Sequence, residues 1–312
     1  MLDATSKAIF HGLAHIPTLQ RLASTYGMAP RSGFARRFIA GETIDEAVEC
    51  VKDLPAKGLN LTLDYLGESV SSGAAAAKAA NDYVQILAVM VSAGVERNIS
   101  LKLTQLGLDV DKATAVDNMR RILEPADAHS FFVRIDMENS PYTDATLEIL
   151  DTLWRQGHTN IGTVIQSYLK RSADDIRNLN VRGVRVRLVK GAYKEPKAIA
   201  YQKKSEVDSA FVDLMQTLLD EGTYPAIATH DPVMIDATKA YAKSKGYAND
   251  RFEFQMLYGI RRDLQTALVK EGYRVRVYVP FGKQWYPYFM RRLGERPANV
   301  AFVLRGVLSD KG

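Results

Sequence analysis

Short apolar or alternating runs recur along most of this sequence and predict eight β-strands. The segments between them carry apolar residues every three or four positions and predict helices. The predicted strands cover residues 58–63, 99–103, 130–135, 161–166, 184–189, 226–229, 252–256 and 273–279. The predicted helices cover residues 73–95, 114–123, 142–156, 173–178, 207–221, 232–244 and 261–270.

A strand followed by a helix, repeated eight times, is typical of a parallel sheet covered by helices. Eight such units in about 255 residues match the size of a TIM (βα)8 barrel, so we predict an α/β fold of this type. An open doubly wound sheet is the alternative. It has less support because no G-x-G-x-x-G run follows the first predicted strand.

Residues 1–55 precede the first strand and are expected to be helical. Residues 34–40, followed by Gly41, predict a short helix with a glycine stop. Thr43 with Glu46 resembles a capping box at the start of a helix over 44–51. We therefore divide the chain into an N-terminal helical segment, 1–55, and a barrel domain, 56–312.

Composition narrows the class of protein without naming a function. Apolar residues make up 46% of the chain and charged residues 25%, which is typical of a globular protein with a sizeable core. The 41 basic and 36 acidic residues are dispersed, and no basic stripe with exposed aromatics indicates nucleic-acid binding. Cys50 is the only cysteine, no apolar run reaches the about 18 residues of a membrane span, and no signal peptide is evident. The sequence thus predicts a cytoplasmic protein and leaves open a peripheral contact with the inner face of the cell membrane.

Polar residues stand at the predicted carboxyl ends of the strands, where (βα)8 barrels carry their active sites. An unpaired buried charge is costly, and a structural ion pair between Lys102 and Asp136 would explain only part of the set. A whole ring of such residues favours an active site. The ring consists of Asp64, Glu68, Lys102, Thr104, Arg134, Asp136, Met137, Glu138, Gln166, Arg187, Lys190, Tyr193, Thr229, His230, Asp231, Gln255, Leu257 and Tyr278.

Two arginines follow a cluster of aromatic residues near the C-terminus. Arg291 and Arg292 lie within about a helical turn of Tyr288, with Trp285, Tyr286 and Phe289 beside it. Guanidinium groups hold carboxylates through two parallel hydrogen bonds, so this segment indicates a site for a small carboxylate. A basic surface helix is an equally good interpretation of the segment taken alone.

Histidines do not indicate a metal site. His11 and His15 have the spacing of a zinc-binding helix, but no glutamate follows His11 and no third ligand is near. His230 at a strand end lacks the carboxylate or histidine partners that a catalytic metal needs. We therefore expect no metal, and we expect His230 to bind a polar group of a cofactor.

Taken in order, these motifs resemble the proline dehydrogenase family, flavoenzymes that also form one domain of bifunctional proline-utilisation proteins. The resemblance runs from about Leu61 to Arg296. At Tyr258 and at 260–262 the sequence departs from the family's pattern, which affects contacts of the outer loop beyond Leu257. The motifs are 66–68 (LGE), 135–138 (IDME), 187–193 (RLVKGAY), 228–230 (ATH), 253–259 (EFQMLYG), 278–282 (YVPFG) and 291–295 (RRLGE).

The resemblance implies a distorted (βα)8 barrel whose last helix lies over its mouth, and non-covalently bound FAD, with FMN as the alternative. It implies that Lys102, Asp136 and Arg187 are catalytic. The implied substrate-binding residues are Lys102, Asp136, Ala192, Leu257, Tyr278, Tyr288, Arg291 and Arg292. The implied cofactor-binding residues are Met137, Val164, Gln166, Arg187, Val189, Lys190, Gly191, Ala192, Tyr193, Thr229, His230, Gln255 and Glu295.

The implied reaction is oxidation of L-proline to Δ1-pyrroline-5-carboxylate, the first step of proline catabolism. A hydride would pass from C5 to flavin N5, and the electrons would then pass to a membrane quinone. Arg291 and Arg292 would hold the carboxylate, while Arg187 and Lys102 would stabilise negative charge on the reduced flavin. The oligomeric state stays open between a monomer and a small homo-oligomer.

Glu68 has two interpretations. It pairs with Arg291 and acts as a gate that loosens when product leaves, or it caps the alanine-rich helix that follows it.

Two other functions of the protein also fit the residues taken alone. One is an aldolase-type barrel that uses Lys102 or Lys190 to form a Schiff base. The other is a barrel that binds a carboxylate without catalysis.

Overall fold

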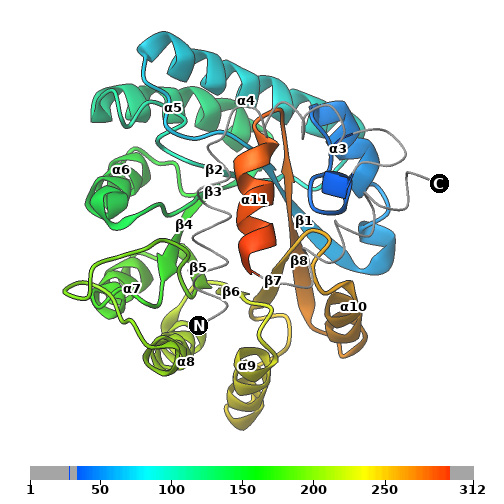
Figure 1. Ribbon diagram of the computed structural model, residues 1–312, viewed down its shortest axis with the longest axis vertical. Helices are drawn as coiled ribbons and strands as arrows, with labels where there is room; N and C mark the ends of the chain where they lie inside the picture. The colour runs from blue at the N-terminus through cyan, green and yellow to red at the C-terminus, as the bar shows by residue number, and fades with distance from the viewer. Residues whose placement is uncertain (1–27, 29–33, 296–312) are drawn as a thin grey trace.

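Eight parallel strands close into a barrel in chain order within the part of the chain that the structure describes. This computed structural model describes Met28 and residues 34–295 (Figure 1). The strands are β1 (Leu59–Tyr65), β2 (Asn98–Leu101), β3 (Phe132–Ile135), β4 (Ile161–Gln166), β5 (Arg185–Val189), β6 (Ala226–Ala228), β7 (Glu253–Leu257) and β8 (Arg274–Phe281). The predicted (βα)8 fold is confirmed, and the predicted strands agree with these bounds to within about two residues.

Helices surround the barrel in Figure 1. They are α3 (Ile44–Val51), α4 (Gly73–Ala93), α5 (Lys112–Ala128), α6 (Thr143–Arg155), α7 (Ser172–Val181), α8 (Lys204–Glu221), α9 (Pro232–Ser244), α10 (Arg262–Lys270) and α11 (Trp285–Glu295). Three short 3₁₀-helices are η1 (Phe34–Arg37), η2 (Pro55–Lys57) and η3 (Ser140–Tyr142). Helix α5 is longer than the predicted 114–123 because Asp111 caps it, its Oδ1 accepting from the Thr114 amide at 2.7 Å.

The main apolar core lies between the barrel and the helices. Leu61 and Leu63 of β1 pack in one cluster with Ile86 and Met90 of α4. The interior of the barrel is polar instead: Arg187 of β5 donates to Ser100 of β2, and these two strands are not neighbours in the sheet. Most (βα)8 barrels fill this space with branched apolar side chains. The interior polar groups here must therefore satisfy one another.

Helix α11 lies across the mouth of the barrel, as the family resemblance implied (Figure 1). Trp285, Tyr288 and Phe289 on this helix are buried in a second apolar cluster. That cluster includes Leu66, which follows β1, and contacts Leu257, which ends β7. The helix thus covers the carboxyl ends of the strands, where barrel enzymes bind their substrates.

The segment before the barrel is described only in part. The predicted helix over 34–40 is a single 3₁₀ turn, η1. The Thr43 hydroxyl caps α3 by accepting from the Glu46 amide at 3.3 Å, as predicted. The Glu46 carboxylate accepts from the amide of Glu42 and not of Thr43, so the predicted capping box is incomplete. The remaining helices predicted within 1–55, with His11 and His15, lie outside the described residues.

None of the helices within 34–295 combines the length and the apolarity that crossing a bilayer requires.

We expect Gly259→Ala to destabilise the protein strongly. Gly259 follows β7 with φ +75°, and a Cβ there would lie 1.8 Å from the carbonyl oxygen of Arg37. The left-handed backbone costs about 1–2 kcal/mol, and the clash adds about 1–3 kcal/mol. Gly94 has φ +66° and open space around it, so Gly94→Ala is the matched control. Chemical unfolding measures the loss of unfolding free energy in both variants. Equal losses would show that the backbone at Arg37 moves away from the new Cβ without cost.

Candidate active site

Asp136 is the centre of a buried polar cluster at the carboxyl end of the barrel. Its Oδ1 accepts from Nη1 of Arg187 at 2.8 Å, and its Oδ2 accepts from the hydroxyl of Tyr278 at 2.8 Å. The Lys102 ammonium lies 3.7 Å from Oδ2. Four different strands, β2, β3, β5 and β8, position these side chains. The structure thus brings together the three residues that sequence analysis assigned to catalysis.

Arg187 is held on three sides. Nε donates to Oε1 of Gln255 at 2.5 Å, and Nη2 donates to Oγ of Ser100 at 2.9 Å, in addition to the Asp136 contact. Its guanidinium carbon lies 5.2 Å from the centre of the Tyr278 ring. Burial and the Asp136 carboxylate raise the pKa of Tyr278 well above its ordinary value, so the phenol keeps its proton. The result is a rigid cation beside a neutral hydrogen-bond donor.

Asp64, near the end of β1, belongs to the cluster, as its place in the ring of strand-end residues indicated, although it was not among the residues that the resemblance implied to be catalytic or to bind substrate or cofactor. Its side chain is 1% exposed, and its Oδ1 lies 3.7 Å from Nζ of Lys102. Burial raises the pKa of Asp64, and the charge of Lys102 opposes that rise. The signal was present in the sequence: leucines at 59, 61 and 63 face the helices, so position 64 faces the interior.

Lys102 remains protonated at neutral pH. Burial by itself would lower the pKa of Lys102, but Asp64 and Asp136 hold that pKa above its ordinary value. A lysine that forms a Schiff base needs the opposite shift, toward a neutral amine. The surroundings of Lys102 therefore suit a fixed cation and not a nucleophile.

Helix α11 carries the two arginines, and Arg291 borders a pocket that it shares with Lys102 of the cluster. Arg291 Nη1 lies 3.3 Å from Oε1 of Glu68, and both side chains are about one-third exposed. The Arg292 guanidinium carbon lies 5.0 Å from the centre of the Tyr288 ring. A small pocket between α11 and the end of β1 is lined by Glu68, Lys102, Tyr288 and Arg291 among others. The helix is therefore not a solvated surface helix, because it forms one wall of this pocket.

Glu68 does not cap the helix that follows it. Ser72 is the N-cap residue of α4, and its Oγ accepts from the Ala75 amide at 3.2 Å. The first turn of α4 contains no acidic residue. The interpretation of Glu68 as a helix cap is therefore wrong, and its described contact is the ion pair with Arg291.

The residues implied to bind a cofactor lie along the ends of β3 to β7. Nε2 of His230 accepts from the Leu257 amide at 2.9 Å, which leaves the ring proton on Nδ1 in the neutral form. Met137, Val164, Gln166, Thr229 and Gln255 are buried, whereas Ala192 is exposed in the loop after β5. Burial raises the pKa of Tyr193 to about 12. The backbone of Glu295 ends α11, and its side chain lies outside the described residues.

The loop after β5, which contains several of the implied cofactor-binding residues, also makes contacts within the protein. Nζ of Lys190 donates to Asp208 at 2.5 Å and to Asp231 at 2.7 Å, so this lysine joins the loop to α8 and to the start of α9. Gly191 has φ +117°, and a Cβ there would lie 2.4 Å from the ring of Tyr168. The loop is therefore fixed by its own contacts before any ligand is considered.

Comparison with known proteins identifies the family. The sequence profile of a family described as proline dehydrogenase matches residues 47–305. The chain is 42% identical over 289 residues to proline dehydrogenase 2 of Bacillus subtilis, covering 93% of this chain and 94% of that protein. It is 40% identical over 312 residues to the proline dehydrogenase of Deinococcus radiodurans, covering 99% of each.

A solved structure shows the same fold. The chain superposes on proline utilization A from Bdellovibrio bacteriovorus, inactivated by N-propargylglycine, with a TM-score of 0.78 and 29% identity. The match covers 84% of this chain and 32% of that one, so the chain spans about a third of that larger protein. Because the profile covers most of the chain and the smaller relatives match over nearly their whole length, this chain belongs to the proline dehydrogenase family.

Proposed function

We propose that this protein oxidises L-proline to Δ1-pyrroline-5-carboxylate, as the first step of proline catabolism. The observation that carries the proposal is the placement of Arg291 and Arg292 on α11. Arg291 lines a pocket that also reaches Lys102, and Lys102 pairs with Asp136, which in turn binds Arg187. The names of the relatives support the same reaction.

We propose that the cofactor is FAD, with FMN as the alternative. Proline dehydrogenases are flavin-dependent, and the flavin supplies the acceptor for the hydride that leaves C5 of proline. The donor set fits such a group: the described residues engage three N–H groups of Arg187, and a guanidinium has five. A ring that accepts a hydride and gains negative charge on reduction is a suitable partner for the remaining donors.

The residues of the site then have distinct roles. Arg291 and Arg292 hold the substrate carboxylate, which fixes the position of the ring and supplies the proximity that catalysis needs. Tyr278, Leu257, Tyr288 and Ala192 surround the ring. Lys102 and Arg187 keep a positive potential where negative charge develops, and their surroundings hold both in position before reaction. Asp136 orients them, since it contacts Arg187, Tyr278 and Lys102 at once.

The two other functions have less support. A Schiff-base mechanism needs a neutral lysine, whereas the carboxylates around Lys102 favour its charged form and Lys190 is held by Asp208 and Asp231. A barrel that only binds a carboxylate would not need the buried Arg187, Asp136 and Lys102 cluster below the binding pocket. Both observations favour an oxidation.

We further propose that the electrons pass to a membrane quinone and that the protein is cytoplasmic, with peripheral contact at the inner face of the cell membrane. The formal net charge of +5 supports weak attraction to an anionic surface. We also propose that the pair of Glu68 and Arg291 is a gate. It ties α11 to the end of β1 while proline is bound and loosens when the product leaves.

The purified protein should show the visible absorption of bound flavin, and L-proline should bleach it without oxygen. An artificial electron acceptor should then be reduced in proportion to proline consumed. D-Proline, which places its carboxylate on the other side of the ring, is the control substrate. A protein that binds no flavin, or whose flavin does not respond to L-proline, would rule out the proposed reaction.

Replacing Arg291 or Arg292 by Met should raise the KM for proline about 100-fold. Loss of a charged bidentate contact costs about 2–4 kcal/mol, and neither residue should be needed to retain flavin. Arg262→Met is the matched control, because Arg262 also stacks on a tyrosine, at 5.4 Å from Tyr258, but lies on α10. An unchanged KM in both α11 variants would remove these arginines from the substrate site.

Glu68→Ala should weaken proline binding by about 1–3 kcal/mol and leave the melting temperature nearly unchanged. A pair this exposed contributes less than about 1 kcal/mol to folding, so its main effect is on the closed state of α11. Ser72→Ala is the comparison, since it removes the cap of α4 and should cost about 1 kcal/mol of stability with a normal KM. A Glu68→Ala variant with a normal KM would contradict the gate.

A further inference from the structure

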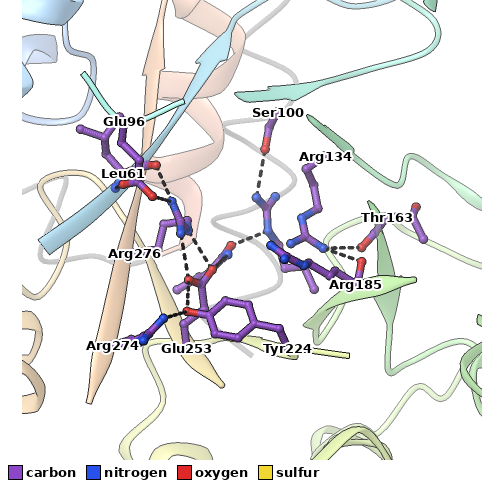
Figure 2. A network of polar contacts seen from close by, with 12 residues as sticks. Leu61, Glu96, Ser100, Arg134, Thr163, Arg185, Tyr224, Glu253, Arg274 and Arg276 are labelled. Atoms are coloured by element: carbon purple, nitrogen blue, oxygen red, sulfur yellow. Dashed lines mark hydrogen bonds and ion pairs between the residues drawn. The ribbon is translucent and has the colours of Figure 1, made fainter. Parts of the chain in front are cut away.

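Polar side chains in the barrel interior form a hydrogen-bonded network that includes Arg276 and Glu253 (Figure 2) and continues through Gln255 to Arg187. In that figure Arg276 of β8 lies between Glu96 and Glu253. Nε and Nη2 of Arg276 donate to the two carboxylate oxygens of Glu253 at 2.8 and 3.0 Å. The side-chain amide of Gln255 donates to Glu253, and its oxygen accepts from Nε of Arg187. One glutamine therefore separates the carboxylate from the arginine of the active site.

The carboxylate of Glu253 is fully engaged and ionised. Its side chain is 2% exposed, and it also accepts from the Tyr224 hydroxyl at 3.2 Å. Burial by itself would raise the pKa of Glu253, but the charge and hydrogen bonds of Arg276 bring that pKa below its ordinary value. An ionised carboxylate has no proton to donate and can only accept.

This property determines which way Gln255 faces. Because Glu253 can only accept, the NH2 group of the Gln255 amide must point toward it. The amide oxygen then points toward Arg187, whose Nε can only donate. If the Gln255 amide were turned over, its NH2 group would face Nε of Arg187, and two buried donors in contact are costly.

We propose that Glu253 is a positioning residue for the reaction: it fixes the orientation of the Gln255 amide, and through that amide the guanidinium of Arg187. Glu253 begins β7, and Leu257 ends the same strand at the site, so Glu253 lies about 13 Å below the reacting groups. It therefore acts through Gln255 and not by contact with a ligand. The readouts below rest on the proposed flavin-dependent oxidation of proline.

Glu253→Gln tests this directly. Oε1 of Glu253 accepts from both Gln255 and Nε of Arg276, while Oε2 accepts from Nη2 of Arg276 and from the Tyr224 hydroxyl. With the oxygen of the new amide at the Oε2 position, where it keeps those two donors, its NH2 faces Gln255, which then turns its own oxygen toward position 253 and its NH2 toward Arg187. We expect kcat to fall about tenfold with the KM for proline unchanged. We also expect the two-electron reduction potential of the bound flavin to fall by about 30 mV, the equivalent of a tenfold loss in stabilisation of the reduced form. Flavin content should stay the same.

Glu96→Gln is the matched control. Glu96 also binds Arg276, but the described contacts do not join it to Gln255. It should lower the melting temperature of the flavin-free protein less than Glu253→Gln does, because the side chain of Glu96 is 32% exposed and that of Glu253 only 2%, and it should leave the flavin potential unchanged. If the two variants have equal potentials and equal kcat, Glu253 has only a structural role and the proposal is overturned.

Two further variants keep the test decisive. The double variant Glu253→Gln with Gln255→Glu returns an acceptor to Nε of Arg187 and should recover most of the potential. Gln255→Met removes the link without touching the pair of Glu253 and Arg276, and Gln255 is also among the implied cofactor contacts. This variant should therefore lower the potential at least as far as Glu253→Gln does, even if that variant folds poorly. A normal potential in Gln255→Met would overturn the proposal. Failure of the wild-type protein to bind flavin or oxidise proline would instead count against the proposed function.

Discussion

The charge of Arg187 inside the barrel must be balanced, and the carboxylate of Asp136 balances it. Taking a guanidinium out of water is costly unless its partner and the remaining donors are satisfied. Asp136 meets this need and at the same time accepts from Tyr278 and lies near Lys102. The same contact that makes the buried arginine tolerable therefore also sets the relative positions of three groups at the mouth of the barrel.

This constraint extends down the barrel. The interior holds polar side chains where most (βα)8 barrels contain apolar layers: Arg276 binds Glu253, and Gln255 and Ser100 both accept from Arg187. Hydrophobic stabilisation must then come from the space between strands and helices, where the main apolar core lies. This separation of a polar barrel interior from an apolar outer layer is chemically useful, because directional hydrogen bonds in the interior connect the site to a rigid scaffold.

Helix α11 combines two kinds of surface. Its aromatic side, with Trp285 and Phe289, is buried against the segments that follow β1 and β7, which anchors the helix over the barrel. Its Arg291 lines the pocket, and the contact of Arg291 with Glu68 is partly exposed to solvent. The apolar packing of α11 contributes more to stability than the single, partly exposed ion pair does. The ion pair of Arg291 and Glu68 can therefore break without unfolding the protein.

Much of this protein could be predicted from the sequence, because strand and helix periods are local properties and the carboxyl ends of parallel strands meet at one edge by necessity. The barrel, the strand bounds and the meeting of Lys102, Asp136 and Arg187 follow from those patterns. The sequence placed Asp64 among the strand-end residues but did not reveal that it pairs with Lys102, that Ser72 caps α4 in place of Glu68, or that Lys190 binds Asp208 and Asp231. Only the tertiary structure decides such pairings. Each one depends on which side chains from distant segments come within hydrogen-bonding distance, and a local pattern contains no information about that distance.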